Sequence, residues 1–289
     1  MTTRPLRSAL YLPASNPRAI EKARTLACDA VILDLEDAVA PDQKTAARDG
    51  AAAAFREGGF GQRTTVLRVN GLDTPWGADD LKAAAALPID AVLLPKVNEA
   101  EDVRRADAAL RKAPKGLKLW VMIETCLAIG HLQDIADGAL WSRLGGFVIG
   151  TNDLALELRA RRGADRAGLL PYLALSVAAA RSRGLAVLDG VCNDFHDLDR
   201  FRAEAEQGRA LGFDGKTLIH PAQIEPCNAA FSPTDAEIAR ARSIAAAFAD
   251  PANAGKGAIQ IDGRMVERLH LVEAERVLGM AGAPDKPFP

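Results

Sequence analysis

The sequence predicts an α/β fold, a (β/α)8 TIM barrel that carries a C-terminal helical extension or lid. Short runs rich in β-branched residues alternate with Ala-rich amphipathic stretches along most of the 289 residues. Most predicted strands are continuous apolar runs, such as VILDL, AVLLP and GFVIG, which is typical of a parallel sheet covered on both faces. Eight such strand–helix repeats fit a closed barrel. An open doubly wound sheet is disfavoured because no GxGxxG sequence follows any strand.

The order of the elements follows from hydrophobic runs and from capping signals. Asn16-Pro17 provides an N-cap followed by a proline at the first helical position, and Ser232-Pro233 opens a further helical stretch at 234–249. The predicted strands are Ser8–Pro13, Ala30–Asp37, Thr64–Asn70, Ala91–Val97, Lys118–Thr125, Gly145–Gly150, Leu185–Val191 and Phe213–Ile219. The predicted helices lie near 17–27, 42–56, 77–87, 99–111, 128–137, 168–183 and 195–211.

The C-terminal section falls outside the eight repeats. The turn-forming residues of 250–257 predict a loop, followed by a short extended piece at 258–262 and a last helix at 264–280. We therefore expect a catalytic barrel domain over 1–232. The extension over 233–289 is too small to fold comfortably alone, so we expect it to pack on the barrel or on a neighbouring subunit.

Composition narrows the class of protein. The net charge of −2 argues against a general nucleic-acid binder, which normally carries a clear basic excess. No run approaches the roughly 20 apolar residues of a membrane span, and the first residues lack the pattern of a signal peptide. The four cysteines have no metal-type spacing and predict free thiols in a reducing compartment. A cytoplasmic protein is expected, with no nucleic-acid or membrane partner.

Polar residues gather where the predicted strands end. In a parallel barrel these carboxyl ends share one rim, where the active site lies. Seven of the eight strands deliver an ionisable group there, more than solvation alone explains. The rim residues are Glu36, Asp37, Arg68, Lys96, Glu124, Asp153, Asp189, Lys216 and His220.

A rim of carboxylates with few histidines and no thiolate suits a hard cation, Mg²⁺ or alternatively Mn²⁺, better than Zn²⁺. Mg²⁺ typically takes one or two carboxylates and completes its shell with water and substrate oxygens. Position alone does not identify the ligands. The eligible carboxylates are Glu36, Asp37, Glu124, Asp153 and Asp189.

Basic rim residues suggest two further roles. The planar fork of Arg68 suits a substrate carboxylate, the alternative being a salt bridge to Glu36 or Asp37. Lys96 or Lys216 could form a Schiff base in a metal-independent aldolase. The surrounding carboxylates disfavour that role because they keep a lysine protonated.

Long sequence runs resemble the citrate lyase β-subunit-like family, the acyl-CoA lyases of the wider HpcH/HpaI aldolase superfamily. The similarity runs in order from about residue 7 to 280, nearly the whole chain. The runs are RSALYLPASNPR, DAVILDLEDAVAPDQK, VLRVNGLDTPWGADDL, VLLPKV, VMIET, GTNDLA, LDGV and GFDGKTLIHPAQIE.

The resemblance implies a Mg²⁺-dependent lyase that breaks or forms a carbon–carbon bond in a 3-hydroxyacyl thioester. The products of a malyl-CoA or citramalyl-CoA type substrate would be acetyl-CoA or another acyl-CoA and a 2-oxo acid. It implies that Glu124 and Asp153 bind the metal, with Glu124 also at the substrate, and that Arg68 contacts the substrate's carboxylate. Arg68, Asp37 and Glu267 are the expected catalytic residues.

The resemblance also implies a CoA site and an assembly. Tyr11, Arg18 and Lys22 would contact CoA, and Ile219 and His220 would line the same cleft. The GRMVE sequence places Glu267 where the family has an acid that reaches a neighbouring subunit's active site. A homotrimer or a multiple of it is therefore expected.

Three departures from the family pattern leave the acyl group and the lid acid open. Ala14-Ser15 replaces Gly-Asn or Gly-Asp, Thr125–Ala128 replaces a Thr-Pro-x-Gly turn, and Glu267 replaces an aspartate. One alternative function is the β subunit of a citrate lyase complex, which acts on citryl-acyl carrier protein. Another is a non-catalytic protein that binds CoA esters.

Overall fold

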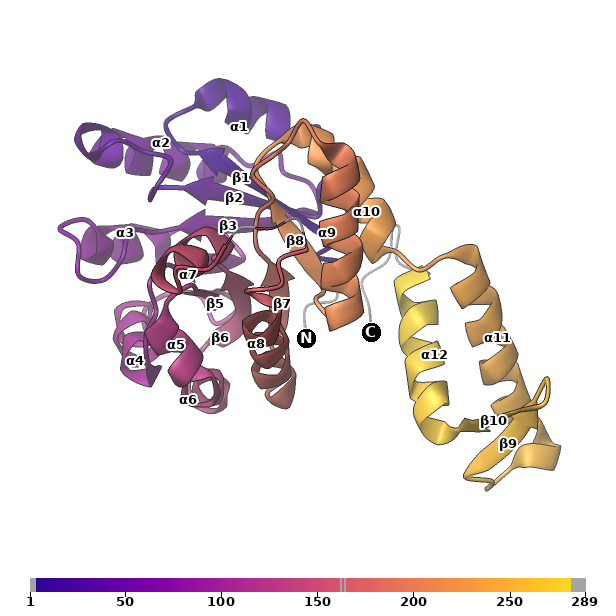
Figure 1. Ribbon diagram of the computed structural model, residues 1–289. Helices are drawn as coiled ribbons and strands as arrows, with labels where there is room; N and C mark the ends of the chain where they lie inside the picture. Colours follow the sequence, from indigo (N-terminus) through magenta and orange to yellow (C-terminus); the bar gives the residue numbers. More distant parts are fainter. Residues whose placement is uncertain (1–3, 162, 164, 282–289) are drawn as a thin grey trace. The chain divides into compact units, whose positions relative to one another are not determined.

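Eight parallel strands close into a barrel, as the sequence predicts. In the closed order β1-β2-β3-β4-β5-β6-β7-β8, the first strand pairs with the last (Figure 1). Most strands are shorter at their carboxyl ends than predicted, because the chain leaves the sheet to form the rim. The strands are β1 (Ser8–Pro13), β2 (Ala30–Asp34), β3 (Thr64–Arg68), β4 (Ala91–Leu94), β5 (Lys118–Ile123), β6 (Leu144–Ile149), β7 (Ala186–Asp189) and β8 (Gly215–Leu218).

This computed structural model describes residues 4–161, 163 and 165–281. The chain divides into two compact units, one over Leu6–Phe231 and another from Ser232 onward. Each is described by itself. No helix among the described residues is long and apolar enough to cross a membrane.

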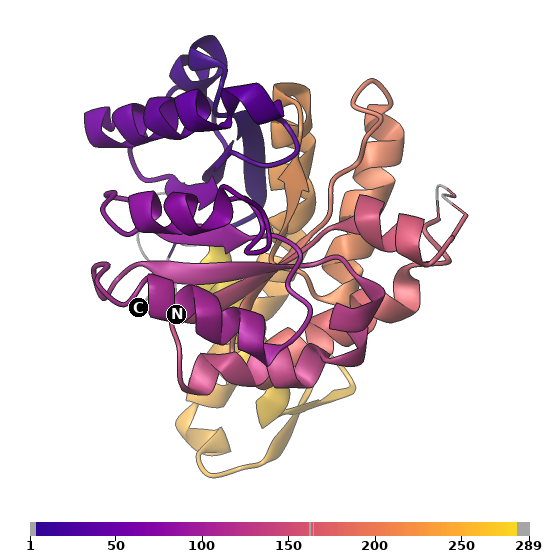
Figure 2. The same cartoon turned by 90° about the vertical axis from the view of Figure 1, so that its left-hand side faces the viewer.

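Helices connect the strands and surround the barrel (Figure 2). The side chain of Asn16 accepts a hydrogen bond from the Ala19 N–H, as expected for the N-cap of the first helix. Two short helices, α7 and α10, were not predicted. The helices are α1 (Pro17–Ala23), α2 (Lys44–Glu57), α3 (Gly77–Ala84), α4 (Ala100–Ala109), α5 (Cys126–Gly130), α6 (Leu132–Ala136), α7 (Thr151–Glu157), α8 (Leu170–Ser182), α9 (Leu198–Leu211) and α10 (Ile224–Phe231).

The barrel core has two apolar layers, which explains the continuous apolar runs. Along β2, Ile32 belongs to the inner cluster, while Val31 and Leu33 belong to the cluster between the sheet and the helices. Because side chains alternate along a strand, Asp34 points to the same side as Ile32. Arg68 likewise shares the side of Val66, which is in the inner cluster. Two charged side chains therefore cap the apolar interior at one end.

The C-terminal unit differs from the prediction at one point. It contains α11 (Asp235–Ala249), β9 (Ala258–Ile261), β10 (Arg264–Glu267) and α12 (Arg268–Ala281). The prediction of a helix from 264 was wrong, because residues 264–267 form a strand that pairs antiparallel with β9. The linking residues Asp262 and Gly263 have φ angles of 49° and 75°. Positive φ at both positions is the conformation of a type I′ turn, for which Asp-Gly is a preferred sequence.

We predict that Gly263→Ala destabilises this hairpin by about 1–2 kcal/mol, because a Cβ is unfavourable in the left-handed region. Hydrogen exchange of the β9 and β10 amides in the full chain would measure the loss of protection. Gly257→Ala is the matched control, since its φ is not positive and its added Cβ would meet open space. Equal protection in the two variants would contradict the prediction.

Candidate active site

The side chain of Arg68 is fixed by Asp34 on the neighbouring strand. The two residues are direct register partners in the β2–β3 pair. Arg68 donates from Nε to Asp34 Oδ1 at 2.7 Å and from Nη2 to Asp34 Oδ2 at 2.6 Å. Both side chains are buried, with Arg68 only 8% exposed. Burial works to lower the pKa of Arg68, but Asp34 and Glu36 keep it well above its ordinary value. The guanidinium is a permanent and oriented positive charge.

The loop after β2 is held by the same aspartate. The Asp34 carboxylate accepts hydrogen bonds from the N–H groups of Glu36 and Ala38. Lys44 on α2 donates to the backbone oxygens of Leu35 and Glu36 at 2.8 and 2.7 Å. The backbone of this loop is therefore fixed on both sides.

Glu36 and Asp37 face the remaining edge of Arg68. The Arg68 Nη1 lies 2.7 Å from Glu36 Oε2 and 3.5 Å from Asp37 Oδ2. Burial raises the pKa of Glu36 to about 8, although Arg68 opposes the shift. Asp37 is largely exposed, with 68% of its side chain accessible. The salt bridge to Glu36 or Asp37, predicted as the alternative role of Arg68, is therefore present in the structure.

Tyr11 of β1 packs against the same guanidinium. The Cζ atom of Arg68 lies 4.9 Å from the centre of the Tyr11 ring, a cation–π distance. The Tyr11 hydroxyl contacts the Met122 sulphur at 4.0 Å. Burial strongly raises the Tyr11 pKa, so its hydroxyl stays protonated at neutral pH. Tyr11 therefore lies beside Arg68, whereas the family resemblance implies that it contacts CoA.

A second cluster joins β4, β5 and α7. The Lys96 ammonium lies 2.5 Å from Asp153 Oδ1 and 3.7 Å from Glu124 Oε1, so one cation bridges the two carboxylates. The Lys96 backbone N–H also donates to Glu124 Oε1 at 2.7 Å. Burial raises the pKa of Glu124, with Lys96 opposing the rise. Burial works to lower the pKa of Lys96, but the two carboxylates raise it overall.

The backbone conformation at Lys96 and the absence of a side chain at Gly150 allow Lys96, Glu124 and Asp153 to approach one another. Lys96 has a φ of 55°, a left-handed conformation that is uncommon outside glycine. Gly150 leaves room for Glu124, because a Cβ at Gly150 would lie 2.3 Å from Glu124 Oε2. These features bring a buried and a half-exposed carboxylate together.

The pair Glu124 and Asp153 fits a divalent cation in its donor chemistry. Both supply hard oxygen ligands, and they already converge on one positive charge, the Lys96 ammonium. The described residues contain no group of three or more His, Cys, Asp or Glu that could hold a metal. Mg²⁺ does not need one, since two carboxylates with water and substrate oxygens complete its shell.

The other residues expected at the CoA site, apart from Tyr11, lie on the surface or at its edge. Arg18 and Lys22 are exposed one turn apart on α1. Ile219 is 39% exposed directly after β8. The His220 ring stacks on Phe195 at 4.7 Å, and its Nδ1 accepts a hydrogen bond from the Ala222 N–H. His220 thus caps the turn that follows, and its Nε2 carries the ring proton when the imidazole is neutral.

Glu267 lies at the end of β10 in the C-terminal unit. Its backbone N–H donates to His270 Nδ1 at 2.9 Å, which fixes the start of α12. The side chain is half-buried. Its expected role as an acid at a neighbouring subunit's site stays a prediction.

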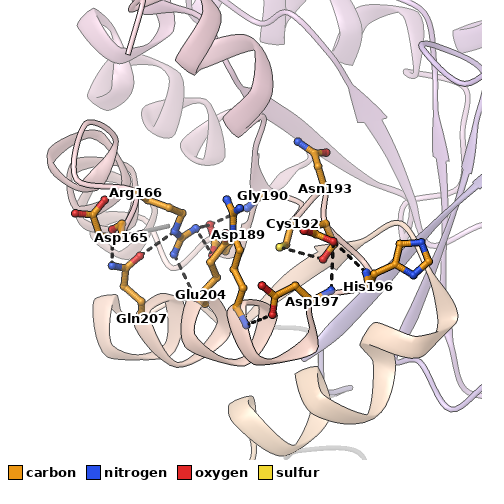
Figure 3. A network of polar contacts seen from close by, with 12 residues as sticks. Asp165, Arg166, Asp189, Gly190, Cys192, Asn193, His196, Asp197, Glu204 and Gln207 are labelled. Atoms are coloured by element: carbon orange, nitrogen blue, oxygen red, sulfur yellow. Dashed lines mark hydrogen bonds and ion pairs between the residues drawn. The ribbon is translucent and has the colours of Figure 1, made fainter. Parts of the chain in front are cut away.

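Two of the expected rim residues, Asp189 and Lys216, belong instead to a buried ionic network, part of which Figure 3 shows. Arg166 Nη1 donates to both oxygens of Asp189 at 2.9 and 2.8 Å, and Lys216 Nζ lies 3.0 Å from Asp189 Oδ2. Glu204 of α9 lies 3.5 Å from Lys216. Asp189 is therefore charge-compensated and unsuited to a metal. The Lys216 amine is buried and engaged by Asp189 and Glu204, which disfavours the Schiff-base alternative.

Asp34 and Arg166 are not among the rim residues that the sequence predicts. Asp34 stands inside a predicted strand, and only the β2–β3 register shows that it faces Arg68. Arg166 lies in the segment between α7 and α8 with a φ of 53°, where hydrophobic periodicity carries no signal. Its Nε also donates to Gln207 Oε1 at 2.8 Å (Figure 3), which ties this segment to α9.

Comparisons with known proteins agree with the fold. The model of the HpcH/HpaI aldolase/citrate lyase family matches residues 7–221. A (3S)-malyl-CoA thioesterase of Cereibacter sphaeroides is 48% identical over 279 residues, which cover 96% of this chain and 95% of the relative. An L-malyl-CoA/beta-methylmalyl-CoA lyase of the same species is 35% identical over 304 residues, 96% and 95% of the two chains. The crystal structure of CitE from Mycobacterium tuberculosis with magnesium, acetoacetate and coenzyme A has a TM-score of 0.78 at 33% identity. That match covers 96% of this chain and 98% of CitE.

We predict that Asp189→Asn lowers the free energy of unfolding by about 3–5 kcal/mol, because it leaves Arg166 and Lys216 buried without their anion. Burial alone would raise the Asp189 pKa, but Lys216 and Arg166 lower it overall. A lowered pKa stabilises the fold above the unfolded-state value and loses that contribution as the pH falls through the folded-state value. Denaturant unfolding at pH 7 and acid unfolding would measure both effects. The matched control is Asp199→Asn, an exposed carboxylate paired with Arg202, for which little change is expected.

Proposed function

The chain belongs to the HpcH/HpaI aldolase/citrate lyase family. Because two of its relatives are named for reactions of malyl-CoA, we propose that it cleaves a malyl-CoA type thioester. Such a substrate carries a hydroxyl and a carboxylate on the same carbon, next to the acyl chain of the thioester. The observation that carries the proposal is the oriented Arg68 guanidinium at the rim that also holds the Glu124–Asp153 pair. One cluster suits the carboxylate, and the other suits a cation that binds neighbouring oxygens.

Hydrolysis of the thioester is the reaction we propose first. Its support is the relative named a thioesterase, which is 48% identical along nearly the whole of both chains. In this reaction water adds to the thioester carbonyl carbon and the carbon–sulphur bond breaks. A malate-type acid and the free CoA thiol leave.

Carbon–carbon cleavage, expected from the sequence, is the second candidate and is favoured by the lyase relative at 35% identity. The hydroxyl loses its proton, the bond to the next carbon breaks, and the electron pair passes to a thioester enolate. An acid then protonates the enolate carbon. Malyl-CoA would yield glyoxylate and acetyl-CoA.

Glu124 and Asp153 are the residues proposed to hold Mg²⁺, with Mn²⁺ as an alternative. The CitE structure was obtained with magnesium, which supports this choice. When bound, the ion would act as a Lewis acid on substrate oxygens. Lys96 would then donate to a single carboxylate or to the substrate.

The protein residues supply orientation and charge. Arg68 would pair with the substrate carboxylate, and Asp34 would hold its guanidinium in position without reorganisation during the reaction. Asp37, exposed beside Arg68, lies where a group could exchange protons with solvent. Arg18 and Lys22, which form no ion pair among the described residues, would offer positive charge to the CoA phosphates.

Carbon–carbon cleavage requires an acid that protonates the enolate carbon. We propose Glu267 of a neighbouring subunit in a homotrimer or a multiple of it. A carboxyl group in a closed and partly dry lid can have its pKa raised towards the working pH.

Our main prediction is that the enzyme turns over (3S)-malyl-CoA with Mg²⁺ and that EDTA abolishes the reaction. A thiol reagent would measure free CoA from hydrolysis, and a hydrazine reagent would measure glyoxylate from carbon–carbon cleavage. Thiol release without glyoxylate is the expected result, while glyoxylate without thiol would establish the lyase. Turnover that chelation leaves untouched would contradict the metal assignment.

The corresponding variant is Glu124→Gln, which removes one negative charge with little change of shape. We expect turnover to fall by at least 10²-fold, as for the loss of a group that stabilises transition-state charge. Glu57→Gln is the matched control, since Glu57 is exposed at the end of α2 and pairs with Arg24. Retained activity in the Glu124 variant would remove this residue from the site.

A separate prediction concerns Glu267→Gln. If Glu267 is the acid, carbon–carbon cleavage should fall by about 10²–10⁴-fold, while hydrolysis changes much less. Mixing this variant with an Arg68→Lys variant should restore some activity, because hybrid trimers would contain intact sites built from two chains. Full glyoxylate release by the pure Glu267→Gln protein would contradict the assignment.

A further inference from the structure

The guanidinium of Arg68 has one edge committed to Asp34 and another that faces Glu36. Asp34 takes the Nε and Nη2 donors, and the Met122 sulphur lies 3.7 Å from Nη1. Glu36 Oε2 lies 2.7 Å from the same Nη1. This edge is the part of Arg68 that remains for a ligand, and it already holds a carboxylate.

We propose that Glu36 occupies the position on Arg68 that the substrate carboxylate takes, and that a substrate carboxylate binds there only when Glu36 carries a proton. The inference rests on the proposed function in one respect, that Arg68 receives a carboxylate. It adds a specificity-determining residue that competes with the substrate, rather than one that reacts with it.

Charge balance around Arg68 is the first reason. One guanidinium already faces three carboxylates, those of Asp34, Glu36 and Asp37. A fourth, from the substrate, would add repulsion in a site where burial weakens screening. Protonation of one resident carboxyl group removes that repulsion without moving the backbone.

Glu36 is the carboxyl group whose surroundings best tolerate the proton. Asp34 accepts hydrogen bonds from two backbone N–H groups and two guanidinium donors, so both of its oxygens are already engaged by donors. Asp37 is solvated. Glu36 Oε2 is buried and accepts no hydrogen bond in the described structure, so its contact with Arg68 is electrostatic only.

The other charged groups around Glu36 act in both directions. Glu124, which directly follows β5, raises the pKa of Glu36, as do Asp34 and Asp37 of its own segment. Arg68 of β3 lowers the pKa of Glu36, and Lys96, two residues after β4, also interacts with Glu36 electrostatically. Lys44 of α2 binds the Glu36 backbone oxygen, and Tyr11 of β1 stays neutral beside Arg68. The resulting pKa of about 8 makes Glu36 largely protonated at pH 7.

The dependence of KM on pH has a defined direction. Below the Glu36 pKa the Glu36 carboxyl group is already protonated, so KM should not change with pH. Above it the free enzyme must take up one proton for each substrate carboxylate bound, so KM should rise about tenfold per pH unit. A cation bound by Glu124 and Asp153 would lower the pH at which KM begins to rise. The difference in KM between the wild type and the Glu36 variants is therefore the decisive measurement.

The experiment measures kcat and KM for (3S)-malyl-CoA from pH 6.5 to 9.5 at saturating Mg²⁺. Glu36→Gln should lose the rise of KM with pH and bind at least tenfold more tightly than the wild type at the alkaline end. Glu36→Asp should keep the rise, and Glu57→Gln should match the wild type. A Glu36→Gln profile that follows the wild-type KM curve would overturn the inference.

A binding measurement separates this inference from the proposed function. Calorimetric titration with pyruvate, in two buffers of different ionisation enthalpy, gives the number of protons taken up. Uptake near one at pH 9 in the wild type and near zero in Glu36→Gln supports the inference, even if malyl-CoA is not turned over. Turnover of malyl-CoA with equal proton uptake in both proteins leaves the function standing and removes the role of Glu36. If pyruvate fails to bind and malyl-CoA is not cleaved, both proposals fall.

Discussion

The register between β2 and β3 is the constraint on which the candidate site depends. It sets Asp34 directly beside Arg68 inside the barrel, where a lone charge of either sign would be strongly unfavourable. Asp34 then also holds the turn that carries Glu36 and Asp37. A shift of either strand by one residue would turn its charged side chain into the apolar layer under the helices and away from its partner. The apolar pattern that secures the barrel therefore also orients its arginine.

Strand register also brings charged side chains together at β7 and β8, but there the balance of charge is different. Asp189, the last residue of β7, is the register partner of Lys216 in β8, and Arg166 contacts Asp189 from the segment between α7 and α8. Here the charges compensate one another within the protein and nothing remains for a ligand. Around Arg68, negative charge exceeds positive charge, and within the described part of the chain the half-exposed Lys96 is the cation that pairs with Glu124 and Asp153. We propose that substrate binds at the part of the rim where the charges are unbalanced, rather than where they are most numerous.

The sequence predicts the barrel well because each strand is buried on both faces and so reads as an unbroken apolar run. The rim is harder to predict, since strand ends such as Asp34 and Asp189 look alike in sequence and differ only in their neighbours across the sheet. Asp34 was missed for that reason, and Asp189 was grouped with possible metal ligands. The hairpin of β9 and β10 was missed although Asp262-Gly263 is a strong turn signal, because the following RMVERLHLVEAERVL also fits a helix. Helix α7 was overlooked because it starts directly after β6 and spans only Thr151–Glu157.

Closure of the barrel also sets the order of events during synthesis. Ser8 pairs with Lys216, so β1 lacks one of its two neighbours, β8, until more than two hundred further residues have been made. At about 5–20 residues per second this takes roughly 10–40 s. Until then β1 presents an open edge, and Asp189 has no lysine beside it. Contacts of such long sequence separation slow folding, so the nascent chain is most exposed to aggregation just before its last strand arrives. Lys216, in the strand that completes the sheet, is also one of the two cations, with Arg166, that neutralise the buried Asp189.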